Sequence, residues 1–297
     1  MKDRAKAVGM LVTAMLIFGS IGLFVRYIPL PSSIIAFVRA FVGVIFLFCV
    51  MLLKGTKVSL ASIKQNLLIL VLSGAAIGFN WILLFESYRY TSIAVSTLCY
   101  YVAPIIVTIF APIVLKEKLS IKRIACAFVA LIGVGLISGL LSSNVLKQGE
   151  ERGIILGLGA ASLYASAILL NKHLHNITAL DRTIFQLLVA AIVLIPYNLF
   201  TCDFGNLVAQ PLTFIFILVV GIVHTGLAYY LYFGAMEHLS GQSIAITSYI
   251  DPLVAVMISV LLLKEYFDVY TVIGGIAILG AAVISELPNK ERRKNDH

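Results

Sequence analysis

The sequence predicts an all-α membrane protein in which ten transmembrane helices form two inverted five-helix repeats around a central cavity. Three observations predict this fold. Of the 297 residues, 61% are hydrophobic and only 12% are charged, about half the charge that a soluble domain carries. Apolar segments of transmembrane length recur along the whole chain. The two halves of the sequence also align with each other at one fixed offset.

The composition excludes several classes of protein. A chain with so little charge cannot cover a globule of this size with a solvated surface, so it is not a soluble domain. The net charge of +8 does not indicate nucleic-acid binding, because the basic residues lie in short loops and tails, where they orient membrane helices. The four cysteines share no motif spacing, which argues against a disulfide framework or a zinc site. We expect no metal and no cofactor.

Ten segments are long enough to cross the membrane. A helix needs about 20 mainly apolar residues to cross the hydrocarbon core, and polar or turn-forming residues separate the segments. The N-terminal run has no small-residue cleavage site after it and is expected to be a span, not a removed signal. The segments are 7–27, 33–53, 67–88, 93–115, 121–140, 153–171, 183–200, 212–234, 241–263 and 269–285.

The distribution of basic residues predicts the orientation of these spans. With the N-terminus inside, sixteen lysines and arginines fall in inner segments and five in outer segments, and Arg39 lies within the second span. Basic residues concentrate in cytoplasmic loops. We therefore expect both termini in the cytoplasm and the chain in the plasma or inner membrane, surrounded by lipid.

The sequence contains an internal repeat. Shifted by 148 residues, "YVAPIIVTIFAPIVLKEKL" (101–119) falls on "YIDPLVAVMISVLLLKEYF" (249–267), Trp81 falls on Tyr229, and Phe85 falls on Phe233. Five spans per half is an odd number, so the second half must insert upside down, an arrangement typical of secondary transporters. We expect a first repeat over residues 1–140, a loop over 141–152, a second repeat over 153–287 and a basic cytoplasmic tail over 288–297.

These residues resemble the EamA family of the ten-helix drug/metabolite transporter superfamily. The duplicated signature is a proline followed by a helix-closing glutamate, present here as Pro104/Glu117 and Pro252/Glu265, with Asp251 before the second proline. The resemblance covers essentially the whole chain. It implies a central cavity between the repeats and the export of amino acids, related metabolites or drugs. The chain departs from the family pattern at a glycine of the fifth span, because Cys126 stands opposite Gly274.

The acid and the proline of the ninth span predict a bent, partly hydrated helix. An ionised Asp251 at mid-span costs about 3 kcal/mol or more unless it finds a partner. Pro252 frees the carbonyl of Ser248, as Pro104 frees that of Tyr100, and such groups must be satisfied by protein or by water in a cavity. We expect hinges at both prolines. Asp251 either handles substrate or protons, or is a structural acid bonded to backbone or to Arg39.

The other candidates are polar or aromatic side chains within the predicted spans. Arg39 either holds a substrate carboxylate or serves structure by snorkelling outward or clamping carbonyls. Aromatic side chains bind planar groups or amines, although helix packing is the alternative. Glu117 and Glu265 are expected to end helices, with a gate as the alternative. The remaining candidates for the cavity are Trp81, Tyr229, Tyr100, Tyr101, Tyr249, His224 and Asn80, and for His224 buried hydrogen-bonded structure is the alternative.

These features predict a secondary-active exporter that works by alternating access, with proton exchange through Asp251 as one form of coupling. A channel-like facilitator is the alternative. An intramembrane enzyme is disfavoured, because the sequence has no HExxH, no GxSxG and no second membrane aspartate for a proteolytic dyad. We expect a small-molecule substrate and no nucleic acid. The sequence predicts neither the identity of the substrate nor the oligomeric state.

Overall fold

A computed structural model describes residues 2–116, 121–137, 149–206, 210–236, 238–239, 241–265 and 268–287. Within these ranges all regular structure is helical. Seven helical stretches are long and apolar enough to cross a membrane: Arg4–Arg26, Ser32–Leu53, Leu67–Tyr90, Ile93–Leu115, Glu150–Asn171, Ala179–Thr201 and Pro211–Met236. Two shorter apolar stretches, Ile250–Leu262 and Val269–Ser285, follow them. The chain is a multi-pass membrane protein.

The described residues of the first half form seven helices. A short helix, α3, lies in the loop after the second span, and the sequence analysis did not predict it. Ser59 caps this helix by accepting a hydrogen bond from the Ser62 amide. The seven helices are α1 (Lys2–Arg26), α2 (Ser32–Leu53), α3 (Leu60–Gln65), α4 (Leu67–Tyr90), α5 (Ile93–Tyr100), α6 (Ala103–Leu115) and α7 (Ile121–Ile137).

The second half is more fragmented. Each of the ten predicted spans coincides with one helix or with a consecutive run of helices, while the number that cross the membrane stays a prediction. The elements are α8 (Glu150–Asn171), α9 (Ala179–Thr201), η1 (Phe204–Asn206), α10 (Pro211–Gly221), η2 (Ile222–Leu227), α11 (Ala228–Met236), α12 (Gly241–Ser248), α13 (Ile250–Met257), η3 (Ile258–Leu262) and α14 (Val269–Glu286).

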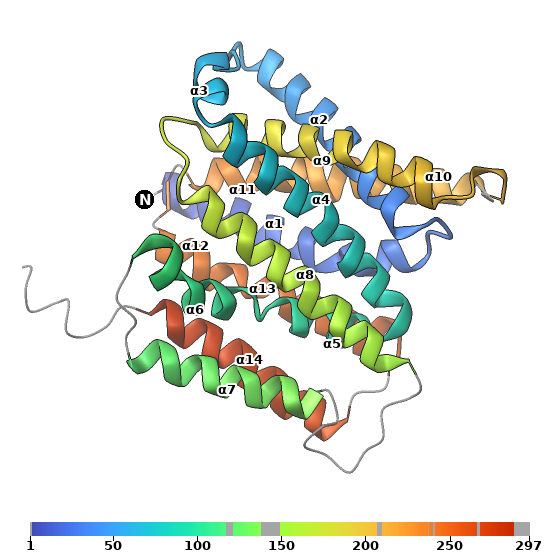
Figure 1. The fold of residues 1–297 in the computed structure, drawn as a ribbon, viewed down its shortest axis with the longest axis vertical. Coiled ribbons are helices and arrows are strands. Elements are labelled where there is room, and N and C mark those ends of the chain that lie inside the picture. The colour runs from blue at the N-terminus through green and yellow to red at the C-terminus, as the bar shows by residue number, and fades with distance from the viewer. Residues whose placement is uncertain are drawn as a thin grey trace, which may run out of the picture.

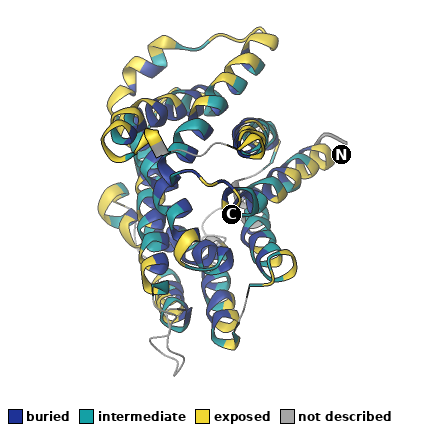
Figure 2. Ribbon diagram, turned by 90° about the vertical axis from the view of Figure 1, so that its right-hand side faces the viewer, coloured by how far each residue is buried: buried dark blue, intermediate teal, exposed yellow. Residues whose placement is uncertain are grey.

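The two halves interleave and do not form separate lobes. α1 packs against α11 and α13, α4 packs between α8 and α9, and α7 pairs with α14 along one edge of the bundle (Figure 1). Buried residues lie between the helices, while exposed residues cover the outward faces (Figure 2). Many of the exposed side chains are large and apolar, such as Leu53 and Phe200. Such a surface suits contact with lipid and would be unusual on a soluble protein.

Two helices are interrupted near the predicted hinges. The fourth span breaks between α5 and α6, and Pro104 lies in the first turn after the break. The ninth span breaks at Tyr249 between α12 and α13, again just before a proline. The Ser248 carbonyl, which Pro252 deprives of its helical donor, receives a hydrogen bond of 3.4 Å from the Tyr101 hydroxyl. Both helices are interrupted beside the prolines, while the bending of these helices and their use as hinges stay predictions.

The eighth and ninth spans contain π-helical segments that have no counterpart among the described residues of the first half. η2 and η3 are π-helices, while the residues 148 positions earlier belong to the α-helices α4 and α6. Single π-helical turns inside α-helices are frequent at functional sites. The two repeats therefore differ in local conformation where the sequence aligns them.

Candidate functional site

A cavity of about 310 Å³ lies between the two halves of the chain. Its walls come from α1, α2, α4, α5, α6 and α8, from α11, and from both pieces of the broken ninth span. The residues predicted from the sequence that line it are Arg39, Asn80, Trp81, Tyr100, Tyr101, Pro104, Tyr229, Tyr249 and Asp251.

Asp251 lies in the first turn of α13. A carboxylate is favoured there, because the first turn of a helix presents unpaired N–H groups and a partial positive charge. Its Oδ2 accepts a hydrogen bond of 2.7 Å from the hydroxyl of Tyr101, which belongs to the other repeat. Among the described residues, no ion pair within 4.0 Å involves Asp251. The sequence left open a pairing with Arg39, and these residues do not form it.

Helix α1 approaches the backbone of Asp251 closely at Gly19. Gly19 has no side chain, and a Cβ added to it would lie 2.5 Å from the backbone carbonyl oxygen of Asp251. Any larger residue would meet this carbonyl. The glycine therefore permits the close approach of α1 to α13 at this point.

Arg39 supplies the positive charge of the cavity. Its Nε donates a hydrogen bond of 2.8 Å to Thr225 Oγ1 in η2, and its guanidinium lies 4.0 Å from the ring centroid of Trp81. The residue is only 5% exposed, so it does not snorkel to the membrane surface. Stacking on Trp81 stabilises the cation and holds the guanidinium beside the cavity.

Aromatic rings from both repeats form much of the cavity wall. Trp81 and its repeat equivalent Tyr229 both line the cavity. The rings of Tyr100 and Tyr164 stack with centroids 5.2 Å apart, and Tyr101 contacts Tyr249 at 6.1 Å. Rings held by other rings lose little freedom when they bind a planar or cationic group.

Asn80 has one satisfied and one unsatisfied polar atom. Its Nδ2 donates a hydrogen bond of 2.5 Å to the carbonyl of Ala160 on α8. Because a carbonyl can only accept, this contact fixes the orientation of the amide. Asn80 Oδ1 is buried and has no hydrogen-bond partner within the described part of the chain. Most buried polar atoms are hydrogen-bonded, so an unpaired acceptor at this wall is notable.

Known proteins of similar sequence identify the family. A model of the EamA-like transporter family matches the chain twice, over residues 5–139 and 151–286. The chain belongs to this family. An uncharacterized transporter of Bacillus subtilis, YxxF, is 32% identical over 96% of this chain and 90% of its own length. The protein PecM of Dickeya dadantii is 25% identical over 72% of this chain and 71% of its own. This EamA protein is a membrane transporter.

A solved crystal structure supports the fold of this EamA protein. It is 15% identical in sequence, covers 99% of each chain and superposes with a TM-score of 0.67. At this level of identity the likeness concerns the fold alone. The family and its transporter-named members indicate transport and not catalysis.

Three candidates of the EamA protein lie apart from the cavity lining. His224 is 2% exposed, and its ring nitrogens lie 3.1 Å from Ser20 Oγ and 3.3 Å from the Val219 carbonyl oxygen. Pro252 is buried beside the break in the ninth span. Glu265 lies at the end of the ninth span among polar contacts described below. Glu117 lies outside the described residues.

The sequence missed several residues of the lining in this EamA protein. Phe18, Thr97 and Tyr232 are among them, and Tyr164 is the most informative. It is the single aromatic residue of a predicted span otherwise rich in Gly, Ala and Ser, "GIILGLGAASLYASAILLN". Small residues allow close helix packing in membranes, so a lone ring among them could have indicated a cavity wall.

The tyrosines of the cavity wall differ in exposure along the bundle of this EamA protein. We call the end of the bundle where α1 finishes and α5 begins the distal end, and the opposite end the proximal end. Towards the proximal end, Tyr164 is 38% exposed, while Tyr88, towards the distal end, is 6% exposed. A second pocket of about 640 Å³ lies at the distal end, and Tyr88 lines both pockets. Tyr88 therefore separates them.

Proposed function

We propose that this EamA protein is a secondary-active exporter of amino acids or small amphipathic metabolites that carries its substrate through the central cavity by alternating access. One observation carries the proposal: the cavity is built from both repeats and has one charge of each sign in its lining, Arg39 and Asp251. Two repeats that can exchange conformations around a shared site produce this kind of mechanism.

The proposal assigns a role to each part of the cavity. Arg39 binds an anionic group of the substrate, and Asp251 binds a cationic group or a proton. Trp81 and Tyr229 pack against the apolar part of the substrate. The breaks before Pro104 and Pro252 act as hinges. With ten spans and cytoplasmic termini in the plasma membrane, the proximal end faces the cytoplasm, as loading of an exporter requires.

The experiment is counterflow in proteoliposomes. A thermal-shift screen of the purified protein against amino acids, amines, sugars and nucleosides first selects a ligand, because a ligand that prefers the folded state raises its apparent stability. Uptake of the labelled ligand should then saturate and should accelerate when unlabelled ligand is present inside. Flux that stays proportional to concentration and ignores the ligand inside would instead identify a channel-like facilitator.

Asp251→Asn tests proton coupling. The substitution keeps the size of the side chain and removes the exchangeable carboxyl proton, so uptake driven by a pH gradient should be lost while counterflow persists. Asp181→Asn is the matched control, because Asp181 is a buried aspartate of α9 that does not line the cavity. Gradient-driven uptake that survives Asp251→Asn would exclude this residue as the coupling group.

A further inference from the structure

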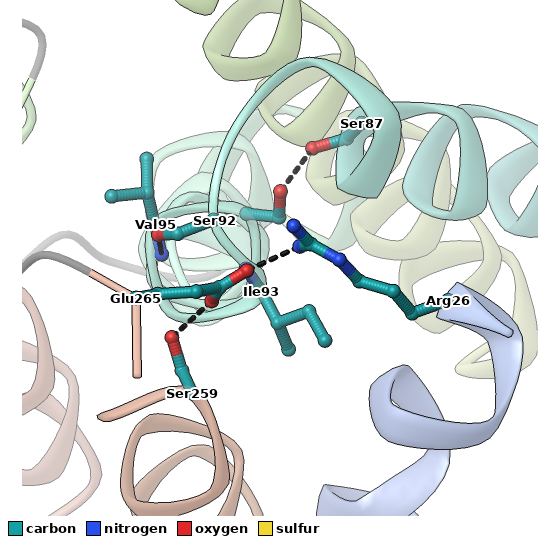
Figure 3. A network of polar contacts seen from close by, with 8 residues as sticks. Arg26, Ser87, Ser92, Ile93, Val95, Ser259 and Glu265 are labelled. Carbon is teal, nitrogen blue, oxygen red and sulfur yellow. Dashed lines mark hydrogen bonds and ion pairs between the residues drawn. The ribbon is translucent and has the colours of Figure 1, made fainter. Parts of the chain in front are cut away.

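Glu265 is the centre of a polar network at the distal end of the bundle (Figure 3). Its Oε1 accepts a hydrogen bond from Arg26 Nη1 at the end of α1. Its Oε2 accepts one from the hydroxyl of Ser259 in η3 and one of 3.1 Å from the backbone N–H of Ile93 in the first turn of α5. One carboxylate therefore joins three elements that are far apart in the sequence.

The backbone before Glu265 is shaped to present this carboxylate. Lys264 is in the left-handed region, with φ 51°, which is uncommon for a residue other than glycine. The turn brings the Glu265 amide back to the Ser259 carbonyl, at 3.0 Å. Lys116, the equivalent residue of the first repeat, has nearly the same φ, 55°. The turn is thus a repeated feature and not an accident of one loop.

The network lies where the transport path would have to open. α1 and α5 both line the cavity, and they already touch beneath the network, because a Cβ on Gly22 would lie 2.6 Å from the Ile93 side chain. α5 is also tied to α4 by a hydrogen bond of 2.5 Å from Ser87 to Ser96. The contacts of Glu265 add charged hydrogen bonds to the direct packing of η3 against α1 and α5. Separation of the distal end between α5 and η3 would therefore break them.

The burial of the partners makes the contact more than a surface ion pair. The Glu265 side chain is 10% exposed and that of Arg26 is 40% exposed. Exposed ion pairs contribute little to stability. Removing a partner from a nearly buried carboxylate costs more, because a buried acceptor is then left unsatisfied. The ion pair of Arg89 with Glu86 at the same end is longer, at 3.5 Å, and its two side chains are 46% and 32% exposed.

We propose that Glu265 is a positioning residue that holds the distal end of the transport path closed, and that its carboxylate leaves Arg26 and the Ile93 amide in each transport cycle. The proposal rests on the alternating-access function proposed above. Glu265 itself does not line the central cavity, so it acts on access to the site and not on the substrate.

The test measures access and needs no ligand. In a background with the four natural cysteines replaced, Leu84→Cys places a single thiol in the cavity one turn before Tyr88. The positively charged, membrane-impermeant reagent MTSET is added to the membrane face from which a thiol at Lys264→Cys reacts. Glu265→Gln should raise the rate of reaction at position 84 by about tenfold or more, since it weakens charged hydrogen bonds.

Two further variants keep the test valid if Glu265→Gln fails to fold. Arg26→Gln removes the half-exposed partner and should raise the same rate in the same direction. The exchange of both charges, Arg26→Glu with Glu265→Arg, should return the rate towards that of the parent. Glu86→Gln is the matched control, because it breaks the other ion pair of the distal end and leaves the contacts of Glu265 intact; the rate should not change.

The outcomes separate this proposal from the proposed function. The role of Glu265 is overturned if the rate of MTSET reaction at position 84 is unchanged in both Glu265→Gln and Arg26→Gln. It is also overturned if Glu86→Gln raises that rate equally. Either result would count even where counterflow saturates normally. Conversely, faster reaction in both variants of a protein whose flux does not saturate supports the closing contact and overturns alternating access.

Discussion

At the scale of single residues, Asn80 carries a cost that an apolar residue would not. Its Oδ1 has no hydrogen-bond partner among the residues that the structure describes, and an unpaired buried acceptor costs about 1–3 kcal/mol. An apolar side chain of similar size would avoid this cost. We expect a substrate with an N–H or O–H donor to recover this cost where its binding exposes Oδ1 to the cavity.

Asn80→Leu should accordingly separate stability from transport. We expect a thermal unfolding midpoint equal to or above that of the parent, because the unpaired acceptor is removed, together with a loss of counterflow of about tenfold or more. Gln186→Leu provides the contrast, since the Nε2 group of that buried amide donates two hydrogen bonds, to Ser73 Oγ at 2.5 Å and to Asn171 Oδ1 at 2.6 Å. Its midpoint should fall. A lower midpoint for Asn80→Leu with full counterflow would show a purely structural role.

Residues of the cavity were predictable where chemistry or symmetry marked them. Asp251 is a carboxylate within a span, and Trp81 is aligned with Tyr229 by the internal repeat. Tyr164 has no such mark, because the repeat places it opposite Leu16. His224 was proposed for its titratable ring, but buried contacts with Ser20 and Val219 occupy it. Such contacts depend on neighbours that only the folded chain brings together.

At the scale of elements, the interrupted helices were predictable and the π-helices were not. A proline removes a helical hydrogen bond wherever it stands, so Pro104 and Pro252 predict the breaks on their own. The π-helix η2 makes a tertiary contact through Thr225, whose Oγ1 accepts a hydrogen bond from Arg39 on α2. The same hydroxyl donates to the Val220 carbonyl five residues back in the eighth span. No local pattern in "IVHTGL" specifies these partners.

The glycines of α1 allow a prediction about how this helix meets the ninth span. Gly19→Ala should lower both the unfolding midpoint and counterflow, because its Cβ would lie 2.5 Å from the Asp251 carbonyl oxygen and relieving such overlap typically costs about 1–3 kcal/mol. Gly9→Ala is the matched control on the same helix. Nothing lies within 4 Å of its Cβ, so it should stabilise by about 0.5–1 kcal/mol. Equal behaviour of the two variants would contradict the close approach.

At the scale of the whole molecule, the repeat predicts the architecture better than it predicts individual contacts. Gly133 and Gly274 are not equivalent positions of the two halves, yet they meet: a Cβ on Gly133 would lie 2.7 Å from the Gly274 carbonyl oxygen. α7 and α14 therefore pack closely, although the alignment placed Cys126 opposite Gly274. A position-by-position comparison of the repeats did not predict this contact, because Gly133 and Gly274 occupy different positions within their repeats.

The inverted insertion of the halves has a direct test at two equivalent residues. Lys116 and Lys264 occupy the same left-handed turn in the two repeats, and both are exposed. Five spans per half should place them on opposite faces of the membrane. In intact cells, with the natural cysteines replaced, an impermeant maleimide should label Lys264→Cys, and should label Lys116→Cys only after the membrane is permeabilised.

The result also decides the orientation of the chain. Labelling in the opposite sense would keep the inverted repeats but place the termini outside, so that the proximal end would face away from the cytoplasm. Labelling of both residues from one face would mean that the halves insert in parallel. The two halves could then not exchange conformations by inverted symmetry, and the form of alternating access proposed for this protein would lose its structural basis.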